Sequence, residues 1–206
     1  MALILEPKWK SYIVETTLPI LTPEQCDEVI RIGQSVPNEQ AKVGTGTLKN
    51  DVKKDVKKDV KDRYDTKMRV TTIGWIPFDQ GAPMYGLIEQ WMLNTNLNHF
   101  GFERMQITEQ AQYTEYPKGG FYEWHVDTDL VMNQMPPVRK ISMTLLLSDP
   151  KDFEGGELEL IDDKKRPSLK RGHALFFASF IRHRVKPVTK GNRKSLVMWF
   201  GGPPLK

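Results

Sequence analysis

Two residues in the stretch FYEWHVDTDL, residues 121–130, have the types and the spacing of metal ligands. His125 and Asp127 are two positions apart, and residues i and i+2 of a strand face the same side, about 7 Å apart along the backbone. An imidazole and a carboxylate on one face can both reach a single metal ion. The same pair is also compatible with a polar pair on a solvent-facing surface or with a general-base pair. A metal site therefore needs a third ligand.

The other histidines are the candidates for that ligand, since the chain has four in all. His99 lies beside Asn98 near the end of a predicted helix and is interpreted as an exposed polar residue. His173 follows Gly172 at the start of one predicted strand, and His183 begins another. A late strand of a β-sandwich can return beside an earlier one, so either of these two can complete the set. Two histidines and one carboxylate hold iron(II) on one face and leave three coordination positions open.

A candidate anion site follows ten residues after His183, at Arg193. The turn at Gly191 sends the chain back, so Arg193 lies on the next strand and can face the same cavity. A guanidinium suits bidentate binding of a carboxylate. Burying it among apolar residues is costly without an anionic partner. An exposed arginine at the start of a strand is the alternative.

The candidate site residues lie in the part of the chain from residue 105 onward, where the sequence pattern predicts strands. They are separated by turn signals at Pro150, Gly155-Gly156, Pro167, Gly172 and Gly191, and comprise MQITEQAQYTEY, KISMTLLLSD, GELELI, HALFFASF, RHRVKPVT and RKSLVMWF. Many strands at short spacing, with no helical periods between them, indicate an antiparallel sandwich or barrel.

The earlier part of the chain favours two helices. Thr22, Pro23 and Gln25 have the spacing of a helix start with a capping box. A second helix is predicted over 82–100, with Gly101 placed to end it. Its inward residues are expected to be Met84, Leu87, Ile88 and Trp91. The predicted fold is therefore α+β and mainly β, a jelly-roll-like core with the N-terminal helices packed on one outer face.

The length of 206 residues predicts a single domain, residues 1–206. Residues 1–104 are expected to form a helical support region and residues 105–206 the jelly-roll core that carries the site. A charged insertion near 44–66 contains NDVKKDVKKDVKDRYD. We expect it on the surface, either as a flap near the site or as a loop without a role.

Composition narrows the setting of the protein. A net charge of +4 is too small and too dispersed to favour a nucleic-acid partner. Cys26 is the only cysteine, which excludes a disulfide within the chain and a thiolate metal cluster. The N-terminus does not resemble a signal peptide. The longest apolar run, around residues 174–177, is far shorter than the roughly 20 residues of a membrane span. A soluble, cytoplasmic protein without a membrane partner is expected.

Three motifs resemble those of the iron(II)- and 2-oxoglutarate-dependent dioxygenases, and within them the prolyl 4-hydroxylase branch. The first is AQYTEYPKGGFYEWHVDTD, residues 111–129. Its matching residues are Gln112, Tyr116, Gly119, Gly120, Tyr122, His125 and Asp127. The second is residues 139–160, a strand followed by a Gly-Gly turn. The third is residues 173–200, with a histidine, a PV-T-x-G turn, a basic residue and a tryptophan. Together they cover roughly the C-terminal half, whereas the N-terminal half is similar only in outline.

The resemblance implies a fold, an activity and roles for particular residues. The fold is the double-stranded β-helix, or jelly roll. The activity is hydroxylation of an unactivated C–H bond, with peptidyl proline as the first substrate and with release of succinate and CO2. The cofactors are Fe(II), 2-oxoglutarate as cosubstrate and O2, with ascorbate as a reductant. The implied metal ligands are His125, Asp127 and His183; Arg193 and Tyr116 bind 2-oxoglutarate; Arg139, Trp199 and Tyr122 contact the substrate, which is a proline-containing protein or peptide.

One position departs from the family pattern, and several alternatives stay open. Leu146 stands where many members carry a tyrosine, so a hydroxyl is missing near the cosubstrate pocket or the substrate. Asp127 is present, unlike in the halogenase variant. Other protein side chains, free amino acids and nucleic acid are alternative substrates. A non-catalytic β-sandwich binding module and a zinc hydrolase are alternatives of other classes.

Overall fold

The computed structural model describes residues 11–41, 67–128, 135–161 and 167–204. The helices are α1 (Pro23–Ser35) and α2 (Ala82–Thr95), followed by the π turn η1 (Asn96–Phe100) and later by the 3-10 turn η2 (Pro150–Asp152). The strands are β1 (Ile13–Glu15), β2 (Asn38–Gln40), β3 (Arg69–Val70), β4 (Thr72–Ile76), β5 (Gln106–Ile107), β6 (Ala111–Tyr116), β7 (Phe121–His125), β8 (Val138–Leu146), β9 (Phe153–Gly155), β10 (Leu158–Leu160), β11 (Ala174–Ala178), β12 (His183–Val185), β13 (Val188–Gly191) and β14 (Arg193–Gly202). The charged insertion predicted near 44–66 lies outside the described residues.

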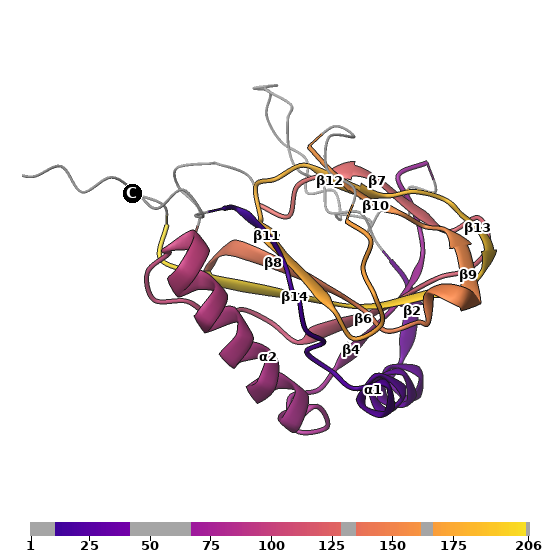
Figure 1. The fold of residues 1–206 in the computed structure, drawn as a ribbon, viewed down its shortest axis with the longest axis horizontal. Helices are drawn as coiled ribbons and strands as arrows, with labels where there is room; N and C mark the ends of the chain where they lie inside the picture. Colours follow the sequence, from indigo (N-terminus) through magenta and orange to yellow (C-terminus); the bar gives the residue numbers. More distant parts are fainter. Residues whose placement is uncertain (1–10, 42–66, 129–134, 162–166, 205–206) are drawn as a thin grey trace, which may run out of the picture.

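Within the described residues, the strands form a large sheet and a small one. The large sheet has the order β1-β11-β8-β14-β6-β4-β2, with β5 paired to β14, and the small sheet has the order β10-β12-β7-β3. Strands β9 and β13 form a separate pair. The small sheet lies on one side of the large sheet and both helices lie on the other (Figure 1). The predicted mainly β, jelly-roll core with helices on one outer face is therefore confirmed.

Both predicted helices are present, and their ends follow the signals in the sequence. The Thr22 hydroxyl accepts a hydrogen bond from the Gln25 N–H while the Gln25 side chain accepts one from the Thr22 N–H, which completes the predicted capping box. Gly101 ends the second helix in the left-handed region, at φ 71°. Met84 and Ile88 are buried as predicted, whereas Leu87 and Trp91 are half-buried against the same core.

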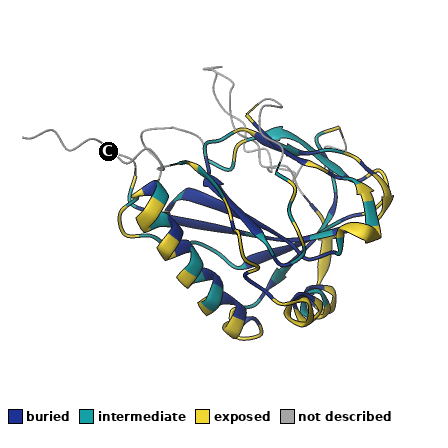
Figure 2. Ribbon diagram, viewed as in Figure 1, coloured by how far each residue is buried: buried dark blue, intermediate teal, exposed yellow. Residues whose placement is uncertain are grey.

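Period-two alternation divides the residues of the central strands between two layers. Ala174, Phe176 and Ala178 of β11 belong to the larger apolar cluster, which the helices cover, whereas Leu175 and Phe177 belong to the smaller cluster. The large sheet is buried between the small sheet and the two helices, and the outer faces of the helices are exposed (Figure 2). The smaller cluster leaves room between the sheets for a cavity.

Strands also come from the chain before residue 105, where the sequence predicted a helical support region. Strand β1 pairs with β11, and β4 pairs with β6, both in the large sheet. Strand β3 pairs with β7 in the small sheet. Among the described residues, no helix is both long and apolar enough to cross a membrane.

Candidate active site

A cavity of about 590 Å³ opens between the two sheets. Every residue that the sequence predicted for the site lines it: His125, Asp127, His183, Arg193, Tyr116, Arg139, Trp199 and Tyr122. Alternation along β14 explains part of this convergence. Arg193, Ser195, Val197 and Trp199 line the cavity, whereas Leu196 and Met198 belong to the apolar cluster that the helices cover.

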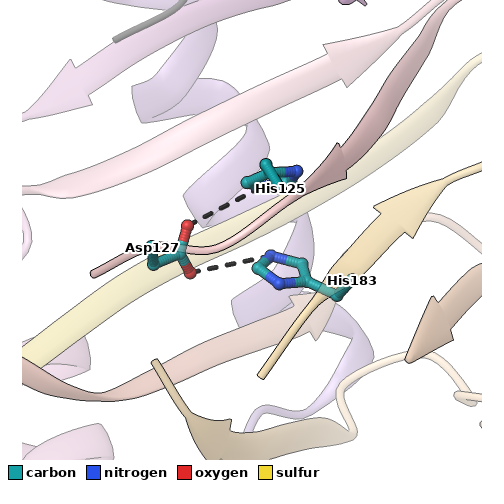
Figure 3. A group of neighbouring side chains, drawn as sticks. All are labelled: His125, Asp127 and His183. Atoms are coloured by element: carbon teal, nitrogen blue, oxygen red, sulfur yellow. Dashed lines mark ion pairs between the residues drawn. The ribbon is translucent and has the colours of Figure 1, made fainter. Parts of the chain in front are cut away.

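Three potential metal ligands meet at one point of this cavity (Figure 3). His125 at the end of β7 lies directly opposite His183 at the start of β12. Asp127 follows β7 and is held by a hydrogen bond from its N–H to the Ser179 carbonyl at 2.9 Å. One ligand atom from each of the three residues lies within 4.8 Å of the others. His173 is not part of this group. It directly precedes β11, and its Nδ1 lies 3.0 Å from the Thr16 carbonyl.

Both imidazoles are oriented for metal binding. His125 Nδ1 lies 2.7 Å from the Glu123 carbonyl, and His183 Nδ1 lies 3.0 Å from the Ile181 carbonyl. Because a carbonyl only accepts hydrogen bonds, Nδ1 carries the proton and Nε2 keeps its lone pair. Each Nε2 lies 3.6 Å from one oxygen of Asp127. This donor set, two imidazoles and one carboxylate, fits Fe(II).

The charge state of the group fits the same role. Burial, together with the neighbouring His183, lowers the pKa of His125 to about 3, so this imidazole is neutral. Burial alone would raise the pKa of Asp127, but the two histidines and a hydrogen bond from Ser142 hold it below its ordinary value. The Ser142 hydroxyl donates to Asp127 Oδ2 at 2.6 Å and lies 2.9 Å from the Ser179 hydroxyl. The carboxylate is therefore ionised and fixed in position.

Arg193, the candidate anion-binding residue, lies elsewhere in the cavity. Arg193 is 3% exposed, and its Nη1 donates to the Ser195 hydroxyl at 3.1 Å. Its guanidinium lies over the ring of Tyr116, the residue opposite it on β6. No carboxylate of the described residues pairs with it, and burial lowers its pKa. A buried cation in this state is suited to a ligand carboxylate.

Leu146, the departure from the family pattern, is buried opposite Ser195 and does not line the cavity. Thr144, two residues earlier on β8, is the polar residue of that strand face that does. The residues with hydroxyl groups that contact Arg193 are therefore Ser195 and Tyr116.

The remaining wall is built from aromatic rings and fixed charges. Arg139 forms two hydrogen bonds with the Glu109 carboxylate, at 2.7 and 2.6 Å, and its guanidinium lies 4.0 Å over the Trp199 ring. Trp75 lies beside Trp199, with 6.2 Å between the ring centroids. Arg139 is thus already paired and acts as a rigid part of the wall.

Tyr122 stacks on His125, with ring centroids 3.5 Å apart and an angle of 16° between the planes. Residues three apart on a regular strand face opposite sides. Here a bulge in β7 brings them together, because His125 and Tyr122 pair with His183 and Val185, which are only two apart. Trp124 lies outside the cavity lining, against Arg182 and Arg184, because neighbouring residues of a strand face opposite sides.

Sequence reasoning missed several cavity residues, among them Arg69, Trp75 and Glu109. Arg69 and Trp75 come from β3 and β4, before the part of the chain that carries the motifs. The only signal for them was the short β-type run RVTTIGWI, which predicts a strand but not its place beside the site.

Comparison with known proteins agrees with this geometry. The family model of the 2OG-Fe(II) oxygenase superfamily matches residues 111–201, which include the three metal-ligand candidates and Arg193. The resemblance expected from the sequence is confirmed over these residues, which are similar to the 2OG-Fe(II) oxygenase superfamily.

Curated relatives include PKHD-type hydroxylases. The protein of that name from Colwellia psychrerythraea is 33% identical over 132 residues, covering 53% of this chain and 57% of the relative. One from Idiomarina loihiensis is 43% identical over 98 residues, covering 47% and 44%. The chain thus spans about half the length of these relatives.

Solved structures share the fold over nearly the whole chain. The viral collagen prolyl hydroxylase of Paramecium Bursaria Chlorella virus-1, in its 2OG complex, gives a TM-score of 0.69 at 17% identity and covers 94% of this chain and 97% of that one. A prolyl hydroxylase from Trichoplax adhaerens, in complex with a hypoxia inducible factor peptide fragment, gives 0.68 at 17% identity and covers 93% and 84%. At this identity the likeness establishes the fold.

Proposed function

We propose that the protein is an iron(II)- and 2-oxoglutarate-dependent dioxygenase that hydroxylates an unactivated C–H bond of a peptidyl proline. One observation carries the proposal. A two-histidine, one-carboxylate group with its ligand atoms within 4.8 Å of one another shares a single cavity with Arg193, a buried cation that has no carboxylate partner among the described residues. A zinc hydrolase would need the first feature but not the second.

His125, Asp127 and His183 would hold the iron, and Arg193 with Tyr116 would bind the distal carboxylate of 2-oxoglutarate. Bound iron(II) would supply the activation of O2 that is coupled to the conversion of 2-oxoglutarate into succinate and CO2. Ser142 keeps Asp127 in its ligating position. The stacked pair of Tyr122 and His125 and the wall of Trp199 and Arg139 exclude water and position the substrate.

The choice of proline rests on the shape and chemistry of the wall. Tyr122 and Trp199 present aromatic surfaces that suit an apolar ring, and Trp75 adds a third. The solved structures with this fold support the same choice. Two of them are named prolyl hydroxylases, and one of these is in complex with a peptide. A proline-containing protein or peptide is therefore the proposed partner, with ascorbate as the reductant that maintains iron(II).

A cytoplasmic setting belongs to the same proposal. The lone cysteine, Cys26, is buried, and burial raises its pKa to about 11, which makes it an unreactive thiol. The net charge of +4 gives little support to nucleic acid as the substrate.

The first test is an anaerobic titration of the iron(II)-loaded protein with 2-oxoglutarate, followed by visible absorption. A weak metal-to-ligand charge-transfer band is expected in the wild type and is expected to be absent in His183→Ala. His173→Ala is the matched control and should keep the band. Formation of succinate on addition of O2 and proline-containing peptides then tests the substrate. A folded, iron-loaded wild type without the band would contradict the proposal.

A further inference from the structure

Arg69 is a charged residue of the cavity that the proposed function does not use. It lies on β3, outside the family match, and is 8% exposed. One Nη donates to the Gln112 side-chain oxygen at 3.1 Å, and the guanidinium lies 4.4 Å over the ring of Tyr122. Its Nε is buried and has no hydrogen-bond partner among the described residues.

The other charges of the described cavity lining are matched. Arg139 pairs with Glu109. Asp127 would be matched by the metal, and Arg193 by the distal carboxylate of 2-oxoglutarate. The charges of a divalent metal and the dianionic cosubstrate would cancel, so among the described lining residues one positive charge, on Arg69, would stay unmatched. A buried guanidinium in that state is costly unless a ligand supplies the anion.

The position of Arg69 separates it from the cosubstrate end of the cavity. Gln112, which binds Arg69, lies opposite Trp75 on one neighbouring strand and Val197 on the other. Tyr116, opposite Arg193, is four residues further along the same strand, which is roughly 13 Å. Arg69 therefore lies at the end lined by the tryptophans, and only the Tyr122 ring separates it from His125.

We propose that Arg69 binds a carboxylate of the substrate, close to the carbon that is hydroxylated. This inference rests on the proposed function and names the substrate class: an apolar ring for the aromatic wall, with one negative charge beside it. The carboxylate can be a main-chain terminus, as in a free or C-terminal proline, or an acidic side chain next to proline within a peptide.

Two pairs of probes that differ by a single charge test this. The first pair is N-acetyl-proline and N-acetyl-prolinamide, and the second is acetyl-Gly-Pro-Asp-amide and acetyl-Gly-Pro-Asn-amide. Each is titrated anaerobically into protein loaded with iron(II) and 2-oxoglutarate, with the fluorescence of the cavity tryptophans as the readout. The acidic member of at least one pair is expected to bind about tenfold tighter or better. The pair that shows the preference identifies the source of the carboxylate.

Variants assign the preference to Arg69. Arg69→Met should bind both members equally, Arg69→Lys should keep part of the preference, and Arg31→Met, on an exposed part of α1, should keep all of it. The charge-transfer band with 2-oxoglutarate reports in each variant that the site is intact. Wild type that shows the band but no charge preference in either pair overturns this inference and leaves the proposed function standing. Absence of the band would instead remove the proposed function.

Discussion

Each side chain of the proposed metal-binding triad is held by a neutral hydrogen-bonding group. Backbone carbonyls fix the two imidazoles, and the Ser142 hydroxyl fixes Asp127. Neutral partners hold the ligands without adding charge beside the metal. The ligands are thus preorganised, and little side-chain entropy is lost when the ion binds.

Removing one of these hydrogen-bonding partners should weaken metal binding. We expect Ser142→Ala to lower the affinity for Mn(II) by about 10- to 100-fold, because Asp127 loses the bond that orients it. Isothermal titration calorimetry measures the change. Ser148→Ala is the matched control, since it removes a buried hydroxyl that bonds to the Asn192 carbonyl and the Lys194 N–H instead. Equal affinities in wild type and Ser142→Ala would contradict the role.

Arg193 should act on one end of the cosubstrate only. We expect Arg193→Met to raise the Kd for 2-oxoglutarate by about tenfold or more, because a charge-assisted bond to the distal carboxylate is lost. 2-Oxobutyrate, which keeps the 2-keto acid but lacks that carboxylate, should bind both proteins equally in the charge-transfer titration. An equal loss for both ligands would show that the variant damages the metal end instead.

For single residues, the sequence predicted which side chains could bind a metal, but it did not predict the side chains that pack around them. The two-residue spacing of His125 and Asp127 placed both on one face, and the third ligand was limited to two histidines. Spacing could not choose between them, because the choice depends on which strand lies opposite β7. The stacking of Tyr122 on His125 was beyond reach, since it depends on a bulge that has no clear sequence signal.

Among the helices and strands, the positions where the chain must change direction constrain the sequence most. Gly172 precedes β11 at φ +77°, and a Cβ there would lie 2.1 Å from the Leu21 carbonyl oxygen. Its N–H donates to the Leu146 carbonyl and its own carbonyl accepts from Ile20. This residue therefore joins the segment before α1 to two strands of the large sheet, and only glycine allows both the conformation and the approach.

Substitution there should be far more damaging than at another glycine. We expect Gly172→Ala to lower the free energy of unfolding by about 2 kcal/mol or more, from left-handed backbone strain and the contact with Leu21. Gly86→Ala is the matched control. A Cβ at Gly86 in α2 meets no atom within 4 Å, and alanine should stabilise the helix by about 0.5–1 kcal/mol. Urea unfolding measures both, and similar values for the two variants would refute the argument.

Element types were largely predictable, but their partners were not. The capping box and the terminal glycine gave the helices, and β-type runs between turn signals gave the strands after residue 105. The short strands β1, β2, β3 and β4 were not predicted, because each has at most five residues. Their pairing is decided by contacts with strands more than thirty residues away, which local patterns do not encode.

At the scale of the whole molecule, the two parts of the chain are interleaved. The segment before residue 105 covers the large sheet with both helices, adds strands to both sheets and supplies Arg69 and Trp75 to the cavity. Cutting it away would expose the larger apolar cluster and leave the outer edges of β11, β6 and β7 unpaired. The single domain over residues 1–206 stays a prediction, and the behaviour of a separate C-terminal fragment tests it.

A fragment of residues 105–206 is therefore expected not to fold cooperatively, although it contains all the metal-ligand candidates. Its near-UV circular dichroism should lack the fixed aromatic signal of the full chain, and urea should give no sigmoidal transition. Adding a separately expressed fragment of residues 1–104 should restore part of the signal if the interleaved contacts are what is missing. A 105–206 fragment that unfolds cooperatively and binds metal alone would instead make the N-terminal segment an accessory of an independent core.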